Sequence, residues 1–227
     1  MSTIKALLER ISIELTDKAR TSWSVADLVS YYNSAIAAIA NYRPDVFAKT
    51  QEFTCVAGTR QAMPAGAVKL IEVERNTGGR KIRFFKRGEL DDLDPEWMTG
   101  AGAAAAEAYL HEPTNPRTFW LYPGVAAGVK VDLVLSALPA PVDVAQVESG
   151  VALQVDDTFL TPCMDWIIYR AYMRDADDVV NSNRGQMHLQ SFVQYLGVTI
   201  ETDQAIASTR STKYQTNQGL SLIHISE

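Results

Sequence analysis

Apolar residues recur at helical spacing near the start of the chain. They predict a first helix from Ser2 to about Leu15, with one stripe of four residues: Leu7, Leu8, Ile11 and Leu15. A second helix is predicted from Ser24, because Asp27 three residues later completes a capping-box arrangement. This helix is expected to end at Arg43, since the residue before a proline is pushed out of the helical region.

The pattern changes to strands and turns in the middle of the chain. Residues 51–64 are predicted to form a hairpin that turns at Gly58, and Asn76–Gly79 is a second turn signal. Gly100–Ala106 is predicted to be a flexible loop, because its small residues have little to pack. A short helix is expected at Glu89–Trp97. Further strands are predicted at Val68–Val73, Lys81–Phe85, Tyr109–Glu112, Thr118–Tyr122 and Val129–Leu135.

Helical spacing returns near Thr158. The segment Phe159–Met173 is apolar nearly all round, and such a helix is usually covered on several sides by its own fold or by a neighbouring subunit. A last helix is predicted around Arg184–Leu196, with Gly197 as its C-cap. Five residues of the apolar helix are candidates for subunit or bundle packing: Trp166, Ile167, Tyr169, Arg170 and Tyr172.

These elements together predict an α+β fold. Helices from both ends of the chain form a bundle, and a central antiparallel β-rich insert is sandwich-like or barrel-like. The predicted parts are N-terminal helices at 1–48, the β-rich insert at 49–150, C-terminal helices at 151–197 and a polar flexible tail at 198–219. Residues 220–227 resemble the translation of a sequencing-library transposon end, so we expect them to be a sequencing artefact and leave them out of the fold.

Composition narrows the function classes. The 227 residues carry a formal net charge of -6, which argues against a general nucleic-acid binder. No apolar stretch approaches the length of about 20 residues that a membrane span needs, and no signal peptide is evident. The two cysteines, Cys55 and Cys163, are expected to be reduced and buried, which suits a reducing cytoplasm.

Basic residues gather in one local run: Arg75, Arg80, Lys81, Arg83, Lys86 and Arg87. One interpretation is an exposed, solvated face of a hairpin. The functional interpretation is a contact surface for DNA or for an acidic neighbouring subunit. Acidic residues cluster nearby at Asp91, Asp92 and Asp94, and we interpret them as a solvated helix start because the spacing lacks the glycine and distal glutamate of a calcium loop.

Catalytic and metal-binding patterns are not found in the sequence. His111 and His188 lack partners at metal-ligand spacing, and we expect no metal or other cofactor. A Cys-dependent hydrolase that pairs Cys163 or Cys55 with His188 stays open as an alternative, because such partners meet only in space. A host-surface binding module built on the β insert is the second alternative.

Several short motifs, taken in order, resemble a known family. They are Asn41-Tyr42-Arg43-Pro44-Asp45, Val56-Ala57-Gly58-Thr59-Arg60-Gln61, Met63-Pro64-Ala65-Gly66, Glu74-Arg75-Asn76, Asp94-Pro95-Glu96-Trp97, Asn115-Pro116-Arg117-Thr118-Phe119, Leu121-Tyr122-Pro123 and Ile168-Tyr169-Arg170-Ala171-Tyr172 with Asp175. In this order and spacing the chain resembles the head-to-tail adaptor (connector) proteins of short-tailed bacteriophages. The loop Gly100–Ala106 and the C-terminal residues depart from that pattern.

The resemblance implies a structural virion protein rather than an enzyme. About a dozen copies would form a ring between the portal protein and a tail or nozzle protein, sealing the DNA channel and providing a platform for the tail. Genome DNA would pass through without specific binding, and no membrane would be involved. The protein would be assembled into the virion in the cytoplasm of the host bacterium.

Overall fold

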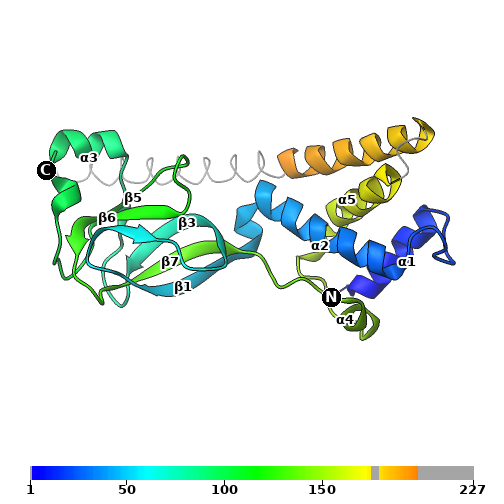
Figure 1. The fold of residues 1–227 in the computed structure, drawn as a ribbon, viewed down its shortest axis with the longest axis horizontal. Coiled ribbons are helices and arrows are strands. Elements are labelled where there is room, and N and C mark those ends of the chain that lie inside the picture. The colour runs from blue at the N-terminus through cyan, green and yellow to red at the C-terminus, as the bar shows by residue number, and fades with distance from the viewer. Residues whose placement is uncertain (1, 175–178, 199–227) are drawn as a thin grey trace, which may run out of the picture. The chain divides into compact units, whose positions relative to one another are not determined.

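The computed structural model describes residues 2–174 and 179–198, which divide into two compact units (Figure 1). One unit takes the residues up to Ile39 and those from Val142 onward, and the other is Ala40–Pro141. The described residues contain six α-helices and two β-sheets, so the predicted α+β class is confirmed. The predicted division into N-terminal helices at 1–48, a β-rich insert at 49–150 and C-terminal helices at 151–197 stays a prediction.

Two N-terminal helices form at the predicted places. Helix α1 (Ile4–Glu14) is capped by the Thr3 hydroxyl, which accepts a hydrogen bond from the Ala6 N–H at 3.2 Å. Helix α2 (Val25–Tyr42) begins with the expected capping box, because Ser24 Oγ accepts from the Asp27 N–H and Asp27 Oδ2 accepts from the Ser24 N–H. The residues of the predicted α1 stripe are all buried.

A carboxylate orders the loop between these two helices. Asp17 is only 9% exposed, and its two oxygens accept hydrogen bonds from the backbone N–H groups of Thr21, Ser22 and Trp23 at 2.9–3.0 Å. These bonds, that from Trp23 first, lower the pKa of Asp17 to about 2. The loop therefore has a fixed shape, and the Trp23 indole N–H reaches the carbonyl oxygen of Ala171 at 3.0 Å.

The second half of the helical unit contains one helix that the sequence analysis missed. Helix α4 (Val144–Glu148) has a capping box between Asp143 and Gln146. The 3-10 turn η3 (Asp157–Phe159) leads into α5 (Leu160–Met173), as predicted. Residues 179–198 are helical, so Gly197 lies inside the helix, and its predicted role as a C-cap is wrong.

Helix α5 is enclosed by other helices of its unit. Ile167 and Cys163 are fully buried, and the Trp166 indole N–H donates to Ser34 Oγ on α2 at 2.9 Å. The Trp166 ring also lies 4.9 Å, centroid to centroid, from Phe192 on helix 179–198. Much of the apolar surface of α5 is thus covered within the chain.

Seven strands form two sheets in the unit Ala40–Pro141. The short 3-10 helix η1 (Pro44–Phe47) precedes them. The strands are β1 (Ala48–Thr54), β2 (Gly58–Ala62), β3 (Ala67–Asn76), β4 (Arg83–Phe84), β5 (Ala108–His111), β6 (Thr118–Val125) and β7 (Lys130–Ala137). One sheet has the order β1-β7-β3 and the other β2-β6-β5-β4, and neither closes into a barrel. The expectation of antiparallel pairing fails at one place, because β4 and β5 run parallel.

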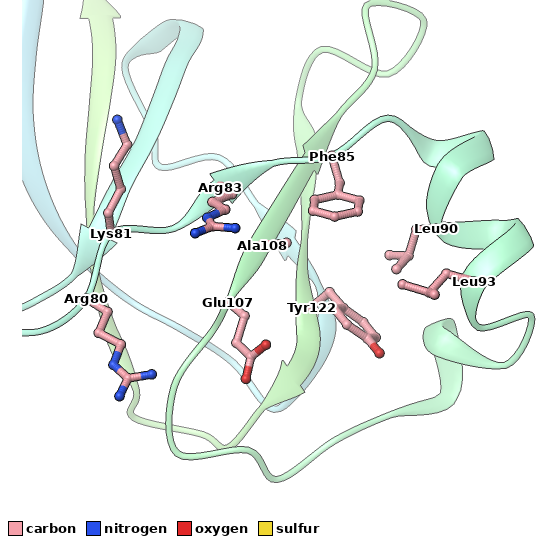
Figure 2. Close-up of a pocket in the computed structure, with 9 residues that line it drawn as sticks. All are labelled: Arg80, Lys81, Arg83, Phe85, Leu90, Leu93, Glu107, Ala108 and Tyr122. Carbon is pink, nitrogen blue, oxygen red and sulfur yellow. The ribbon is translucent and has the colours of Figure 1, made fainter. Parts of the chain in front are cut away.

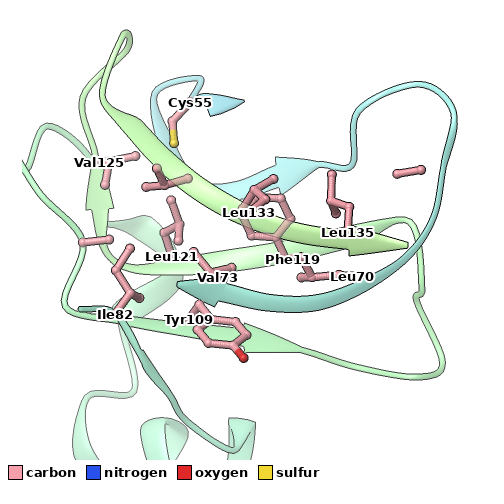
Figure 3. Close-up of a cluster of buried hydrophobic side chains, with 13 residues drawn as sticks. Cys55, Leu70, Val73, Ile82, Tyr109, Phe119, Leu121, Val125, Leu133 and Leu135 are labelled. Atoms are coloured by element: carbon pink, nitrogen blue, oxygen red, sulfur yellow. The ribbon is translucent and has the colours of Figure 1, made fainter. Parts of the chain in front are cut away.

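Both sheets contribute to one hydrophobic core (Figure 3). Its largest members include Leu70, Phe119, Leu121 and Leu133, which come from β3, β6 and β7. A smaller cluster of Leu90, Trp97 and Leu110 lies under α3 (Arg87–Leu93) and the 3-10 turn η2 (Trp97–Thr99). The predicted helix at Glu89–Trp97 is thus present with shifted bounds.

The predicted hairpin at 51–64 does not form. Strand β1 pairs with β7 and strand β2 pairs with β6, so the two halves of the expected hairpin belong to different sheets. The connection between them is held by Gln61, whose side chain bonds both the N–H and the carbonyl of Val56 at 2.9 Å. Local alternation of apolar residues indicated strands correctly, but the long-range pairing with β6 and β7 determined their partners.

The predicted flexible loop at Gly100–Ala106 is held in place. The buried Asn76 side chain accepts from the Ala106 N–H at 2.9 Å and donates to the Ala106 carbonyl at 2.7 Å. At its other end the loop approaches β6 so closely that a Cβ on Gly124 would lie 1.9 Å from the Gly100 carbonyl oxygen. The prediction failed because small residues permit close backbone contact as well as flexibility.

Some predictions fall outside the described residues. These concern the polar tail beyond Val198, the octapeptide 220–227, and the motif residue Asp175. Within the described residues, none of the helices is both long enough and apolar enough to cross a membrane.

Ile167→Asp is expected to prevent folding of the helical unit. Ile167 is 0% exposed, and an unpaired buried carboxylate in its place costs about 4 kcal/mol or more, a large part of a typical domain's stability. Thermal unfolding followed by circular dichroism measures the loss. Thr161→Asp, at an exposed position in the first turn of the same helix, is the control and is expected to leave the melting temperature nearly unchanged.

Asp17→Asn is expected to destabilise the protein in a pH-dependent way. Because the folded pKa of Asp17 is depressed from 3.8 to about 2, its contribution is fully present above pH about 4 and is lost as the pH falls towards 2. The difference in unfolding free energy between wild type and variant should therefore be largest at neutral pH and shrink below pH 4. A difference that is constant from pH 7 to pH 2 would contradict the role given to the carboxylate.

Candidate interaction surface

The structure places the six basic residues of the run along one continuous path. Arg75 stands near the end of β3, Arg80 and Lys81 follow the turn, and Arg83 lies in β4. Lys86 and Arg87 begin helix α3. All six side chains are exposed, so the run lies on the surface of the β-rich unit.

Three of these cations have carboxylate partners. Arg75 Nε lies 2.8 Å from Asp132 Oδ2, and Lys81 Nζ lies 3.3 Å from Glu72 Oε1. Arg87 lies 3.2 Å from Glu112 and 3.7 Å from Asp91. Within the part of the chain that the structure describes, the other three side chains have no acidic partner: Arg80, Arg83 and Lys86.

Arg75 belongs to a structural network. Asp132 on β7 has a nearly buried side chain that accepts a hydrogen bond from Thr77 Oγ1 at 2.7 Å as well as from Arg75. These two bonds, that from Thr77 first, lower the pKa of Asp132. The network links the end of β3 and the following turn to β7. Arg75 therefore has a structural role in the β-rich unit.

A cleft lies beside the unpaired arginines (Figure 2). Its volume is about 420 Å³. It is lined by Arg80, Lys81, Arg83, Phe85, Leu90, Leu93, Glu107, Ala108 and Tyr122. Figure 2 shows the basic side chains on one side and Phe85, Leu90, Leu93 and Tyr122 on the other. The cleft is therefore cationic along one wall and apolar along the other.

The apolar wall is fixed by the small core under α3. The Trp97 indole N–H donates to Asp91 Oδ1 at 2.7 Å, which fastens η2 to α3. The Tyr122 hydroxyl donates to Asp94 Oδ2 at 3.4 Å, and loss of hydration together with this carboxylate raises the pKa of Tyr122. Tyr122 therefore stays neutral at physiological pH, and Leu93, which is 68% exposed, completes an accessible apolar edge.

Acidic groups stand close to the cationic wall. Glu107 lies in the cleft itself, and α3 and the residues after it carry Glu89, Asp91, Asp92, Asp94 and Glu96. Residues 40–141 contain 12 basic and 12 acidic side chains, so this unit has no net charge. A long polyanion lying across this surface would contact both positive and negative side chains. This disfavours binding of duplex DNA by charge alone.

The five candidate packing residues of α5 all take part in contacts inside the helical unit. Ile167 is buried, and Trp166 and Tyr169 stack edge to face at 5.5 Å. The Arg170 guanidinium lies 5.8 Å from the centre of the Tyr31 ring, and Tyr172 lies 6.4 Å from the Trp23 ring. Their role in subunit contacts stays a prediction, and Arg170 is the most exposed of them.

Neither cysteine is placed for nucleophilic chemistry. Burial raises the pKa of Cys163 to about 12 and that of Cys55 to about 11, so both are thiols at neutral pH. His188 does have an acidic partner, which the sequence spacing concealed, because its Nδ1 lies 2.8 Å from Oδ1 of Asp165 on α5. In the described residues no three His, Cys, Asp or Glu side chains are grouped to hold a metal ion.

Comparison with protein families gives one result across nearly the whole chain. The family model described as SU10 adaptor protein matches residues 2–215. The chain belongs to the SU10 adaptor protein family. No curated protein matches the chain. The resemblance to phage head-to-tail adaptors is thus confirmed, and the protein is assigned to a family of structural phage adaptors.

Membership of this family favours a role in contacts between proteins over the hydrolase and binding-module alternatives. An adaptor works by contact with other virion components, so surfaces such as the cleft matter more than buried thiols. The assignment gives no support to a Cys-dependent hydrolase or to a host-surface binding module. The cleft could not be predicted from local patterns, because Ala108 on β5 and Tyr122 on β6 also line it, and both are distant in sequence from β4.

Arg75→Gln is expected to lower the melting temperature, because it removes one of the two donors that hold the nearly buried Asp132 carboxylate. Arg83→Gln, at an exposed position without an acidic partner in the described residues, is the matched control. Thermal unfolding of both variants beside the wild type makes the comparison. Equal melting temperatures for the two variants would contradict the structural role of Arg75.

Proposed function

We propose that this protein is a structural component of the virion that forms a ring between the portal and the tail. The ring would close the DNA channel and provide the platform to which the tail attaches. The observation that carries the proposal is the match of the adaptor family model over residues 2–215. The partners would be the portal protein, a tail or nozzle protein and other copies of the chain. About a dozen copies would form the closed ring, as the resemblance to phage head-to-tail adaptors implies.

The proposal includes a fold in which helices from both ends of the chain make a bundle and residues 40–141 are inserted into it. The composition of the helical unit supports this arrangement, because it draws on residues before Ile39 and after Val142. The protein would be non-enzymatic and need no cofactor. Both thiols are buried and protonated, which is consistent with this role.

The cleft beside Arg80 and Arg83 would contact an acidic protein partner rather than DNA. Two unpaired guanidinium groups favour carboxylates, and the apolar wall with Leu93 favours an apolar side chain beside them. Glu107 and the acidic residues of α3 would repel an extended phosphate backbone. Genome DNA would then pass the ring without specific binding, and the six acidic residues in excess lie outside residues 40–141.

The proposed function is tested with the full chain and the portal protein of the same phage. Co-sedimentation in an analytical ultracentrifuge should show the chain joining the portal as a complex much heavier than the portal alone. A chain that stays monomeric and never joins the portal, at concentrations where both are folded, would contradict the adaptor assignment for this protein.

Arg83→Glu is expected to raise the concentration of chain needed for assembly on the portal by at least about tenfold. The reason is that it replaces an unpaired cation of the cleft by a negative charge, which repels an acidic partner. Arg60→Glu, on an exposed residue of β2 away from the cleft, makes the same charge change and should assemble normally. The same sedimentation experiment measures both. If Arg83→Glu assembles as well as wild type but loses affinity for DNA, the cleft faces nucleic acid instead.

A further inference from the structure

The outer edge of strand β1 is open. In the order β1-β7-β3, β1 is an edge strand that pairs with β7 on one side, and no other described strand is hydrogen-bonded to it. Six of its seven residues are exposed, and the segment contains neither proline nor glycine. An unpaired edge of this length is a template for another strand, and proteins usually guard such edges.

The register shows which backbone groups face outward. The Cys55 N–H donates to the Val129 carbonyl at 2.7 Å, and the antiparallel register continues in steps of two to Phe53 opposite Val131 and Gln51 opposite Leu133. The odd-numbered residues of β1 therefore exchange their hydrogen bonds with β7. The N–H and carbonyl groups of the alternate residues Thr50, Glu52 and Thr54 point away from the sheet, whereas the Ala48 N–H donates to the Asp45 carbonyl.

The opposite edge of the same sheet is guarded. On β3, the Ala67 carbonyl accepts a hydrogen bond from the Arg117 side chain at 2.5 Å. Further along, the Glu74 carbonyl accepts from the Ile82 N–H at 3.1 Å, so the segment before β4 covers that end. One edge of the three-stranded sheet is thus capped by the chain itself, whereas β1 leaves the other edge of this sheet open.

The side chains of β1 indicate what an added strand would carry. Lys49 and Phe53 lie four residues apart and so share one face of the strand. Lys49 has no acidic partner in the described part of the chain, whereas Glu52 on the other face is already paired with Lys130 at 2.7 Å. Phe53 packs edge to face on Phe119 at 5.6 Å at the margin of the core, which leaves room for an apolar neighbour.

We infer that β1 accepts an extended segment of a different protein by strand addition, with an acidic side chain opposite Lys49 and an apolar side chain beside Phe53. The choice of a different protein over a dimer paired through β1 rests on the proposed ring. Pairing of β1 with β1 of a second copy would close a two-fold dimer, which does not repeat around a ring. The main-chain ladder at Thr50 and Glu52 supplies affinity, and the two flanking side chains supply selectivity.

The test uses the full chain and the synthetic peptide STFTVTDTS as probe. In antiparallel register its phenylalanine falls beside Phe53 and its aspartate opposite Lys49. Amide hydrogen exchange by NMR should show the Thr50 and Glu52 amides slowed by at least about tenfold on peptide binding, while those of Gln51 and Phe53 are protected from the start. The control peptide STFPVPDTS lacks the two N–H groups that would face Glu52 and Thr50, and it should not bind.

Two variants separate strand addition from other binding. Thr50→Pro removes an outward N–H and should keep the fold while abolishing peptide binding, whereas Gln51→Pro removes an N–H that faces β7 and should unfold the unit. Lys49→Glu should lose affinity for STFTVTDTS and regain it for STFTVTKTS. Lys49→Glu is expected to fold normally. The exchange of charge between Lys49 and the peptide therefore still tests strand addition if Thr50→Pro proves unstable.

The outcomes distinguish this inference from the proposed function. Peptide binding that survives Thr50→Pro, or binding of the proline peptide with equal affinity, would overturn the strand-addition inference even if the chain joins the portal. A two-fold dimer of the free chain that disappears on Thr50→Pro would overturn the choice of a different protein. Failure of the chain to join the portal, with the peptide effects intact, would instead reject the ring.

Discussion

The broad apolar surface of helix α5 sets the main constraint on this chain. The helix buries Pro162, Cys163, Met164, Ile167, Ile168 and Ala171, and exposure of such a surface to water costs free energy in proportion to its area. The structure covers it from several directions. The α2 residue Ser34 and the Phe192 ring on helix 179–198 both meet the Trp166 indole, and the Trp23 indole caps the Ala171 carbonyl. Segments from both ends of the sequence must therefore meet, which leaves residues 40–141 to build a core of their own.

The β-rich unit shows how a basic run in sequence becomes a mixed surface in three dimensions. Arg75 forms an ion pair with Asp132, Lys81 with Glu72, and Arg87 with Glu112 and Asp91. Half of the basic run is therefore neutralised by nearby carboxylates. Of the cations that remain, Arg80 and Arg83 line the cleft opposite apolar side chains from α3 and β6. A surface of this kind selects a partner by the combination of charge and apolar contact, which suits a protein that works by assembly.

The sequence predicted those features that depend on local patterns. The capping box at Ser24 and Asp27, the stop before Pro44 and the apolar stripe of α1 are local, and the structure has them. Strand partners are not local, so the alternation at residues 51–64 suggested a hairpin where two sheets meet instead. Helix α4 could have been found, because Asp143 and Gln146 have the spacing of a capping box.

The candidate surfaces were only partly predictable for the same reason. The basic residues were named from the sequence, but the cleft needs α3 beside β4, and the open edge of β1 follows only from its pairing with β7. The carboxylate Asp165 lies 23 residues before His188 and meets it only after two helices pack. Family membership then supplied what no single residue pattern did, which is the class of protein to which the chain belongs.

The most direct measurement for the central claim is a cryo-electron microscopy reconstruction of the full chain bound to the portal protein of the same phage. The account predicts a closed ring of this chain stacked on the portal around a shared channel, with the cleft at Arg83 in contact with protein. A reconstruction with the portal alone, or with single copies bound at random positions on its outer surface, would contradict the account.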